Sequence, residues 1–451
     1  MHVQTVRLLF SLAALSISIT VAAEEALPPV AWQGVTEIAT GPGTKGPWRQ
    51  NESRYAYVDD PAVAIDEQGR VAVAWADQAR KDVFFQRLPA AGGQPVGEPI
   101  NLSRSPDTFS WLPRIALAPD APKAVYVLWQ EIIFSGGSHG GDILFARSED
   151  GGASFSAPIN LSSSIGGDGK GRITRELWHN GSLDLLAGAD GALYAAWTEY
   201  DGPLWFSRSS DGGKSFSPPR RLAAAADGKP ARAPALALGP DGVVYLAWTS
   251  GAAEGGDIQI AVSTDGGASF STPRVVVATA GYSDAPRLAV DAGGTVHLVY
   301  ADSVGGPFEP FRIHYTRSVD RGHSFKAPRV ISEPAPEGTE SAAFPQLGLD
   351  TSGNLYVAWE PYPDHLRRPH GLAFAVSRNS GQSFTEPMLV PGSRDPDGGS
   401  NGGLQGLLMQ KLAVNSAGHL VIANSSFRDG EQSRVWLIRG ELQQVTSAGR
   451  Q

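Results

Sequence analysis

Charged and hydroxyl-bearing side chains stand near the start of several short apolar stretches of this sequence. Arginines recur at these places, and a guanidinium group suits a carboxylate because it offers two parallel N–H donors. Acidic residues, a tyrosine and a histidine in similar positions are groups that can transfer protons. The candidate site residues are Arg54, Asp59, Arg114, His179, Asn180, Arg232, Tyr282, Arg287 and Glu340.

The apolar stretches that follow these residues form a repeat. Each copy has an apolar stretch, a short turn and a second apolar stretch that mostly ends in an aromatic residue; the first copy is residues 62–65 and 71–75. The aromatic positions from Trp75 to Trp359 are 51 to 68 residues apart. Four short strands fit such a unit, which is the size of a propeller blade. Seven copies favour seven blades, with six as the alternative.

The seventh unit has little sequence after its third strand, residues 434–438. A propeller closes its ring when one end of the chain lends a strand to the sheet at the other end. Residues 30–38, ahead of the first unit, are strand-like and can supply that strand. We therefore predict an all-β propeller of four-stranded blades in which an N-terminal strand closes the ring.

An octapeptide with the frame S-x-[DN]-x-G-x-S-F occurs five times, each copy in the turn before the fourth strand of a unit. The aspartate can accept bonds from nearby backbone N–H groups and serine hydroxyls, and the glycine permits a backbone angle that other residues avoid. The phenylalanine can fold back as an apolar anchor. The copies begin at Ser148, Ser209, Ser263, Ser318 and Ser377.

This octapeptide resembles the Asp-box (BNR) repeat of sialidases and other β-propeller proteins. The resemblance covers most of the chain after its N-terminal segment, and it implies the propeller fold more strongly than any chemistry. Sialidases hold a sugar carboxylate with three arginines and use a tyrosine nucleophile, a glutamate that activates it and an acidic aspartate. The best-known sialidases have six blades.

On that resemblance, Tyr282 is the nucleophile and Glu340 and Asp59 are its catalytic partners. Arg54, Arg114, Arg232 and Arg287, with His179 and Asn180, then bind the substrate. The Arg-Ile-Pro signature of the family is absent near the N-terminus; residues 112–115 (LPRI) contain its letters in another order.

Strand direction places these candidates at one end of the propeller. The turns between first and second strands, and the octapeptides, must share one end of every blade. The long and dissimilar loops lie at the other end, where ligand specificity is expected. The octapeptide carboxylates are therefore predicted to be structural.

Three functions remain open on the sequence. The first is a sialidase-like glycoside hydrolase that acts on acidic glycans. The second is a non-catalytic propeller that binds a glycan or protein as a scaffold. The third is a uronate-polysaccharide hydrolase or lyase, for which His139, His179, Tyr282 and Arg114 would supply a base, an acid and a carboxylate neutraliser.

The composition narrows the class of partner. A net charge of −9, with no run of basic residues, argues against nucleic acid. The chain has no cysteine, which excludes disulfides and thiolate metal sites. His365 and His370 match no compact metal-ligand spacing, so we expect neither metal nor cofactor. We expect a monomer whose partner is a carbohydrate or glycoconjugate.

The N-terminal residues resemble an export signal. Arg7 precedes an apolar run, residues 8–21, that is short for a membrane span, and small residues precede Glu24. We predict a signal peptide over residues 1–23 and one propeller domain over residues 24–451. The mature protein would then be periplasmic or secreted, with no stable membrane anchor.

Overall fold

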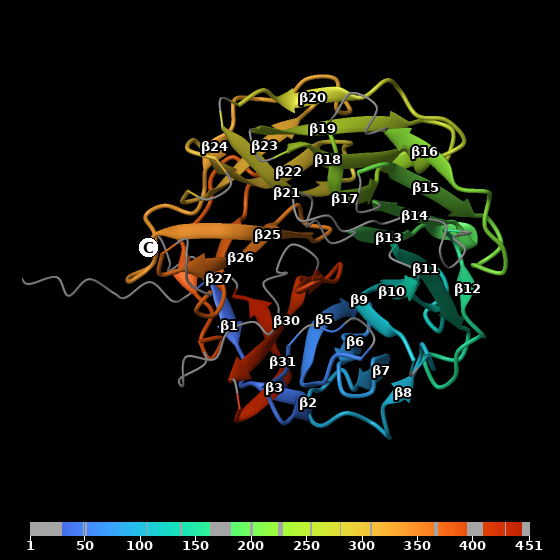
Figure 1. The fold of residues 1–451 in the computed structure, drawn as a ribbon. Coiled ribbons are helices and arrows are strands. Elements are labelled where there is room, and N and C mark those ends of the chain that lie inside the picture. Colours follow the sequence, from blue (N-terminus) through green and yellow to red (C-terminus); the bar gives the residue numbers. More distant parts are fainter. Residues whose placement is uncertain are drawn as a thin grey trace, which may run out of the picture.

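The computed structural model describes residues 29–443, with gaps at 48, 50–51, 106, 136–137, 163–181, 199–201, 224–228, 253–254, 280, 307–308, 365–368, 395–408 and 429. In this part of the chain every long element is a β-strand, and the short 3-10 turns η1 (Ala189–Gly191) and η3 (Pro240–Gly242) are the only helical elements described. The sheets surround a common centre (Figure 1). The prediction of an all-β propeller is confirmed. No described helix is long and apolar enough to cross a membrane.

Four of the sheets have four antiparallel strands, and in each sheet neighbours in sequence are neighbours in space. Their strands are β5 (Val58–Ile65), β6 (Val71–Asp77), β7 (Asp82–Leu88) and β8 (Ile100–Asn101); β9 (Phe109–Leu117), β10 (Val125–Ser135), β11 (Ser138–Ser148) and β12 (Ile159–Asn160); β13 (Leu183–Ala187), β14 (Leu193–Thr198), β15 (Leu204–Ser209) and β16 (Arg220–Ala223); and β25 (Ser341–Leu349), β26 (Leu355–Tyr362), β27 (Ala373–Ser377) and β28 (Met388–Leu389).

A larger sheet contains two successive units of the repeat. A single parallel pair, Gly256 with Tyr282, joins its two halves. Its strands are β17 (Ala231–Leu238), β18 (Val244–Ala252), β19 (Gly255–Ser263), β20 (Arg274–Val277), β21 (Tyr282–Val290), β22 (Val296–Ser303), β23 (Arg312–Ser318) and β24 (Arg329–Val330).

The last sheet brings the two ends of the described chain together. The N-terminal strands β1 and β2 both pair with β31, next to β30 and β29, so blue and red ribbons meet in Figure 1. The small ribbon of β3 and β4 follows β2. These strands are β1 (Val30–Trp32), β2 (Thr36–Gly41), β3 (Thr44–Lys45), β4 (Tyr55–Ala56), β29 (Leu412–Val414), β30 (His419–Arg428) and β31 (Gln432–Leu442).

The core lies between neighbouring sheets. The aromatic residues that end the second strands are almost fully buried: Trp129, Trp197, Trp248, Tyr300 and Trp359 are at most 1% exposed. The first strands β5, β9, β13, β17, β21, β25 and β29 each contact the next, and β29 contacts β5. The first strands therefore line the centre of the ring.

The octapeptides fold as the predicted turns. Ser263 Oγ donates to Asp265 Oδ1 at 2.7 Å and accepts the N–H of Gly267 at 2.7 Å. Asp265 in turn accepts the N–H and hydroxyl of Ser269 at 2.8 and 2.5 Å. These hydrogen bonds hold the pKa of the exposed Asp265 carboxyl well below its usual range. The carboxylate is therefore occupied within its own turn.

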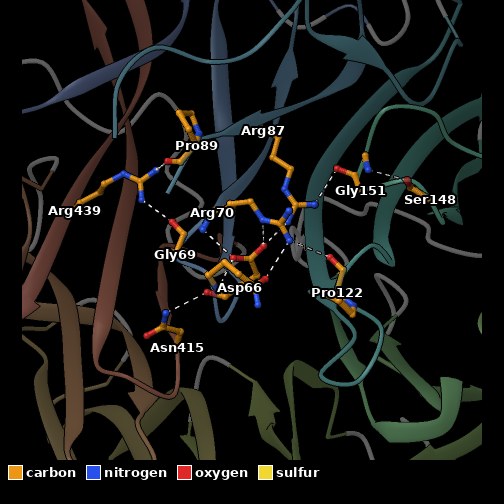
Figure 2. A network of polar contacts seen from close by, with 12 residues as sticks. Asp66, Gly69, Arg70, Arg87, Pro89, Pro122, Ser148, Gly151, Asn415 and Arg439 are labelled. Carbon is orange, nitrogen blue, oxygen red and sulfur yellow. Dashed lines mark hydrogen bonds and ion pairs between the residues drawn. The ribbon is translucent and has the colours of Figure 1, made fainter. Parts of the chain in front are cut away.

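Each octapeptide also fastens one sheet to the sheet before it. Phe270 packs edge-on against Phe206 of the preceding unit, with ring centres 4.9 Å apart. Arg208, on the same preceding unit, donates to the Gly266 carbonyl at 2.8 Å. Figure 2 shows a related junction, where Arg87 lies 2.6 Å from Asp66 and donates to the Gly151 carbonyl at 2.8 Å. The octapeptide is therefore a junction between sheets as well as a turn.

We expect Ser263→Ala to destabilise the protein by about 1–3 kcal/mol, because it leaves the buried N–H of Gly267 without its acceptor. The neighbouring Thr264 is exposed, so Thr264→Ala serves as the matched control and should change little. Urea denaturation followed by tryptophan fluorescence measures both. Equal midpoints for the two variants would contradict the proposed role of the serine.

Candidate functional site

Five of the first strands share a bulge where they enter the centre of the ring. In each, a residue in the left-handed region precedes a proline, and the pairing with the second strand shifts register at that point. A bulge re-aims the side chains beside it, and bulges are frequent next to active sites. The left-handed residues are Asp60, Leu112, Ala233, Ala285 and Phe344, with φ of 50°, 58°, 51°, 54° and 53°.

Four of the nine candidate residues flank these bulges. Asp59 and Arg232 stand just before the left-handed residue, as does Asp284, whereas Arg114 and Arg287 follow the proline. The shared frame explains why residues far apart in the sequence reach the same part of the ring. The repeated X-Pro pair in the first strands is the sequence signal for it.

The first cluster joins Arg114 and Arg287 to Asp184, which the sequence analysis missed. Arg114 Nε lies 3.9 Å from Asp184 Oδ1. Burial and the nearby charge of Arg287 lower the pKa of Arg114 to about 10. Burial raises the pKa of Asp184, although both arginines oppose that shift. Both guanidinium groups thus act on the Asp184 carboxylate, while Asp60 also acts on Arg114 and Asp284 on Arg287.

The Asp184 carboxylate is held in place by the backbone. It accepts the N–H of Leu236 at 2.7 Å and the N–H of Leu185 at 3.0 Å. The side chain of Asp184 is 25% exposed, whereas the side chain of Arg114 is 4% exposed. Solvent therefore reaches Asp184 more easily than Arg114. In the third repeat unit, Asp184 has the position that Arg287 has in the fifth: each pairs with the residue just before the aromatic residue of its second strand.

The second cluster joins Arg232, Tyr282 and Asp284. Arg232 Nε donates to Asp284 Oδ1 at 3.0 Å, and its guanidinium carbon lies 4.6 Å from the centre of the Tyr282 ring. Thr249 also donates to Asp284, at 3.0 Å. Burial, then Asp284, raises the pKa of the Tyr282 hydroxyl well above its usual range. A phenol in this setting resists ionisation.

The third cluster contains the adjacent acids Asp59 and Asp60. Asp59 accepts a hydrogen bond from Gln78 at 2.8 Å, and Gln78 in turn accepts the Trp111 indole N–H at 2.8 Å. Burial and Asp60 raise the pKa of Asp59. Burial also raises the pKa of Asp60 to about 6, despite the opposing charges of Arg114 and Lys411. Asp60 Oδ1 has no hydrogen-bond partner among the described residues.

Lys411 is a second member of the site that the sequence analysis missed. It forms a buried ion pair with Glu360, and Tyr362 donates to the other oxygen of Glu360 at 2.7 Å. Burial lowers the pKa of Lys411. Residues 411–414 read KLAV where residues 287–290 read RLAV, so an alignment of the repeats places Lys411 opposite Arg287.

Two of the predicted residues lie away from these clusters. Arg54 is exposed, and its carbonyl accepts the N–H of Gly46 at 3.1 Å. Glu340 is exposed, and its backbone bonds to Tyr362 and Arg312 at 2.8 and 2.5 Å. No contact between Glu340 and Tyr282 is found in the part of the chain that the structure describes. Among the residues that the structure describes, no contact therefore supports the predicted pairing of Glu340 with Tyr282.

His179 and Asn180, both predicted to bind substrate, lie outside the described residues. Within residues 29–443, gaps aside, no group of three or more histidine and acidic side chains could hold a metal ion. The expectation that the protein needs no cofactor stays a prediction. The site is thus defined by Arg114, Asp184 and Arg287, with Asp60 and Lys411 on the neighbouring strands.

No protein-family model and no curated protein matches the sequence. Solved structures are similar in fold. A protein of unknown function from Dyadobacter fermentans DSM 18053 is 13% identical, with a TM-score of 0.51 over 92% of this chain and 100% of that chain. The polysaccharide lyase Uly1 is 11% identical, with a TM-score of 0.51 over 90% of this chain and 97% of that chain.

The intramolecular trans-sialidase from Ruminococcus gnavus is a weaker match. It is 12% identical, with a TM-score of 0.45 over 75% of this chain and 95% of that chain. At 11–13% identity, the two likenesses with a TM-score above 0.5 show similarity of fold alone. What they say about chemistry has to be argued from the residues of this chain.

The raised pKa of Asp60 predicts a pH dependence of stability. The folded protein holds this proton up to about pH 6, whereas an unfolded aspartate loses it near pH 4. The free energy of unfolding therefore falls as pH rises through this window. Asparagine does not titrate, so Asp60→Asn should remove this fall in the free energy of unfolding. At pH 7 the variant should be more stable than the wild type by about 1–3 kcal/mol.

Asp241→Asn is the matched control, because Asp241 is also left-handed, at φ 60°, but lies at the surface with 78% of its side chain exposed. Urea unfolding at pH 4.5 and pH 7 compares the three proteins. Parallel pH profiles for the wild type and Asp60→Asn would show that Asp60 does not titrate in this window.

Proposed function

We propose that this protein acts on carboxylate-bearing glycans at the centre of the ring, where the first strands begin. The observation that carries the proposal is that two guanidinium groups, those of Arg114 and Arg287, lie close enough together to act on the same carboxylate, Asp184. Arginines gathered in this way offer paired N–H donors that suit the carboxylate of a ligand. Sialic acids and uronic acids both place such a carboxylate on a sugar ring.

Asp60 supplies the proton-transfer group of the proposed reaction. Its pKa of about 6 lets it hold a proton close to neutral pH, as a general acid must. Glycosidic cleavage needs a group that protonates the departing oxygen. Tyr282 suits the role of nucleophile less well, because burial and Asp284 oppose ionisation of its hydroxyl. The fold likeness to the polysaccharide lyase Uly1 is compatible with a polysaccharide ligand.

A second candidate is a propeller that binds a glycan without cleaving it. The observation that favours it is the internal pairing of charge: Arg232 lies 3.0 Å from Asp284, and Lys411 is paired with Glu360. Buried pairs of this kind are common structural features and do not by themselves indicate catalysis. The two candidates share the ligand class and differ in whether product forms.

We also propose that the ring has seven blades of the Asp-box type. The eight-stranded sheet divides at its single parallel pair into β17–β20 and β21–β24, each with the strand order of the other units. The pairing of β1 and β2 with β31 supports closure of the ring by the N-terminal strands. An experimental structure at a resolution that separates strands counts the blades directly.

Export also remains a proposal, because residues 1–28 lie outside the described residues. It is supported by Arg7 and the apolar run that follows. N-terminal sequencing of protein recovered from the periplasm or medium would find Glu24 first. Recovery only from the cytoplasm, with Met1 retained, would contradict export.

The proposed function is tested with sialylated, uronate-containing and neutral oligosaccharides of matched length. We expect the wild type to bind acidic glycans at least tenfold more tightly than neutral ones, and Arg287→Ala to lose that preference. The control is Arg221→Ala, an exposed arginine on the outer strand β16, which should keep it. Isothermal titration calorimetry measures the affinities.

Product analysis by mass spectrometry then separates the two candidates. Asp60→Asn should slow cleavage by about 100-fold or more while binding is retained, if Asp60 is the general acid. Acidic-glycan binding without product from the wild type would favour the binding module. Equal affinity for acidic and neutral glycans, or unchanged binding by Arg287→Ala, would overturn the proposed function.

A further inference from the structure

Arginine side chains fasten several octapeptide turns to the preceding sheet. The arginine stands near the end of the third strand of one unit and donates to the carbonyl of the fourth residue of the next octapeptide. Figure 2 shows one example, Arg87 with Gly151. The three pairs are Arg87–Gly151 at 2.8 Å, Arg208–Gly266 at 2.8 Å and Arg317–Ser380 at 2.6 Å.

Arg147 holds the same position at the end of β11 but makes a different contact. It forms an ion pair with Glu149, the second residue of its own octapeptide. The other four octapeptides carry serine, threonine, valine or arginine at that place, so only this one offers a carboxylate. The Gly212 carbonyl, which Arg147 would otherwise reach, accepts no arginine among the described residues.

The fourth strand of the same unit, β12, does not supply an arginine to the octapeptide at residues 209–216 either. Arg220, Arg274 and Arg329 follow the proline of their octapeptide segments, and each donates to carbonyls of the next octapeptide. The corresponding residue of β12 is Ile159, which packs against the apolar core between its own sheet and the next. The octapeptide at residues 209–216 therefore lacks the arginine contacts described for its counterparts.

A pocket of about 580 Å³ lies at this junction. Its lining includes both Arg147 and Gly212, the two positions that are hydrogen-bonded to each other at comparable junctions. Pro122, Ala124 and Tyr126 supply apolar lining. The pocket thus occupies the place where an arginine head group sits elsewhere in the ring.

We propose that this pocket binds the guanidinium group of an arginine side chain from a partner polypeptide. The lining carries three carboxylates, Glu149, Asp190 and Asp211, against two cationic groups, Lys123 and Arg147, so its net charge is negative. Asp211 is hydrogen-bonded within its own turn and Glu149 is paired with Arg147, which leaves Asp190 as the carboxylate for an incoming cation. The apolar residues can cover the methylene stem of the incoming side chain. The whole chain, at −9, also favours a cationic partner.

The contacts within the ring indicate arginine in preference to lysine. Arg274 donates through Nη1 to the His323 carbonyl at 3.2 Å and through Nη2 to the Gly322 carbonyl at 2.7 Å. A planar fork can reach two successive carbonyls in this way, whereas an ammonium group acts as a compact point charge. An exogenous arginine side chain would repeat an interaction that the protein already makes with itself.

The first test uses two small probes, N-acetyl-arginine amide and N-acetyl-lysine amide, with the intact protein. Ligand-observed NMR titration suits the affinity expected of a single side chain, with a dissociation constant of about 1 mM. We expect the arginine probe to bind at least tenfold more tightly than the lysine probe. Equal affinities, or no binding of the arginine probe, would overturn the proposal.

Two variants place the binding in this pocket. Ile159→Arg installs the arginine that the other outer strands carry, and Glu149→Ala frees Arg147 to bond with Gly212. Each of these two substitutions should lower the affinity of the pocket for the arginine probe at least fivefold. Met388→Arg is the matched control, since Met388 follows the proline at the same place on β28 and is not one of the residues that line the pocket. The affinity of this variant for the arginine probe should be unchanged.

Thermal melting establishes that each variant is folded. Glu149 is exposed, with 69% of its side chain in solvent, so Glu149→Ala still decides the question if Ile159→Arg fails to fold. Unchanged probe affinity in a folded Glu149→Ala protein would overturn the proposal. The proposed glycan site lies where the first strands begin, at the end of the ring opposite the octapeptide turns. The glycan proposal and the arginine-pocket proposal can therefore fail independently.

Discussion

The fold depends on the junction that each octapeptide makes with the sheet before it. The serine and aspartate close the turn, the phenylalanine packs on an aromatic residue of the preceding sheet, and an arginine of that sheet commonly bonds to the turn carbonyls. The chain has no cysteine, so the ring is held without disulfides. Apolar wedges supply most of the stabilisation, while directional hydrogen bonds set how one sheet lies on the next.

The same repeat explains the unusual chemistry at the centre of the ring. Bulges precede five prolines in the first strands, and Asp60, Arg114, Asp184, Arg287 and Lys411, which lie in or next to five of these strands, form one electrostatic network. Burying a charged group costs free energy of folding unless the group is paired with an opposite charge, so unpaired buried charges are usually kept for a function. A left-handed aspartate with a raised pKa adds to that cost, which is why this region is the strongest candidate for function.

Much of this could be read from the sequence because it is local. Strand pairs, the octapeptide turn and the burial of Trp129 or Trp248 follow from short-range patterns and side-chain size. The predicted pairing of Tyr282 with Glu340 depended on how loops enter the ring, and the two residues have no described contact. Asp184 and Lys411, which the prediction missed, stand where Arg287 stands in the fifth unit, so an alignment of the repeats marks their positions; only the folded ring shows which charges they meet.

The sequence by itself determined an all-β propeller and the end of each unit at which the turns repeat, since both follow from residue type and strand direction. Only the tertiary structure decided which charges meet. Arg87 bonds to the next turn while Arg147, in the same frame, turns back to Glu149. A guanidinium group on a long side chain can reach several acceptors, so its choice depends on which carboxylate or carbonyl the folded ring brings closest.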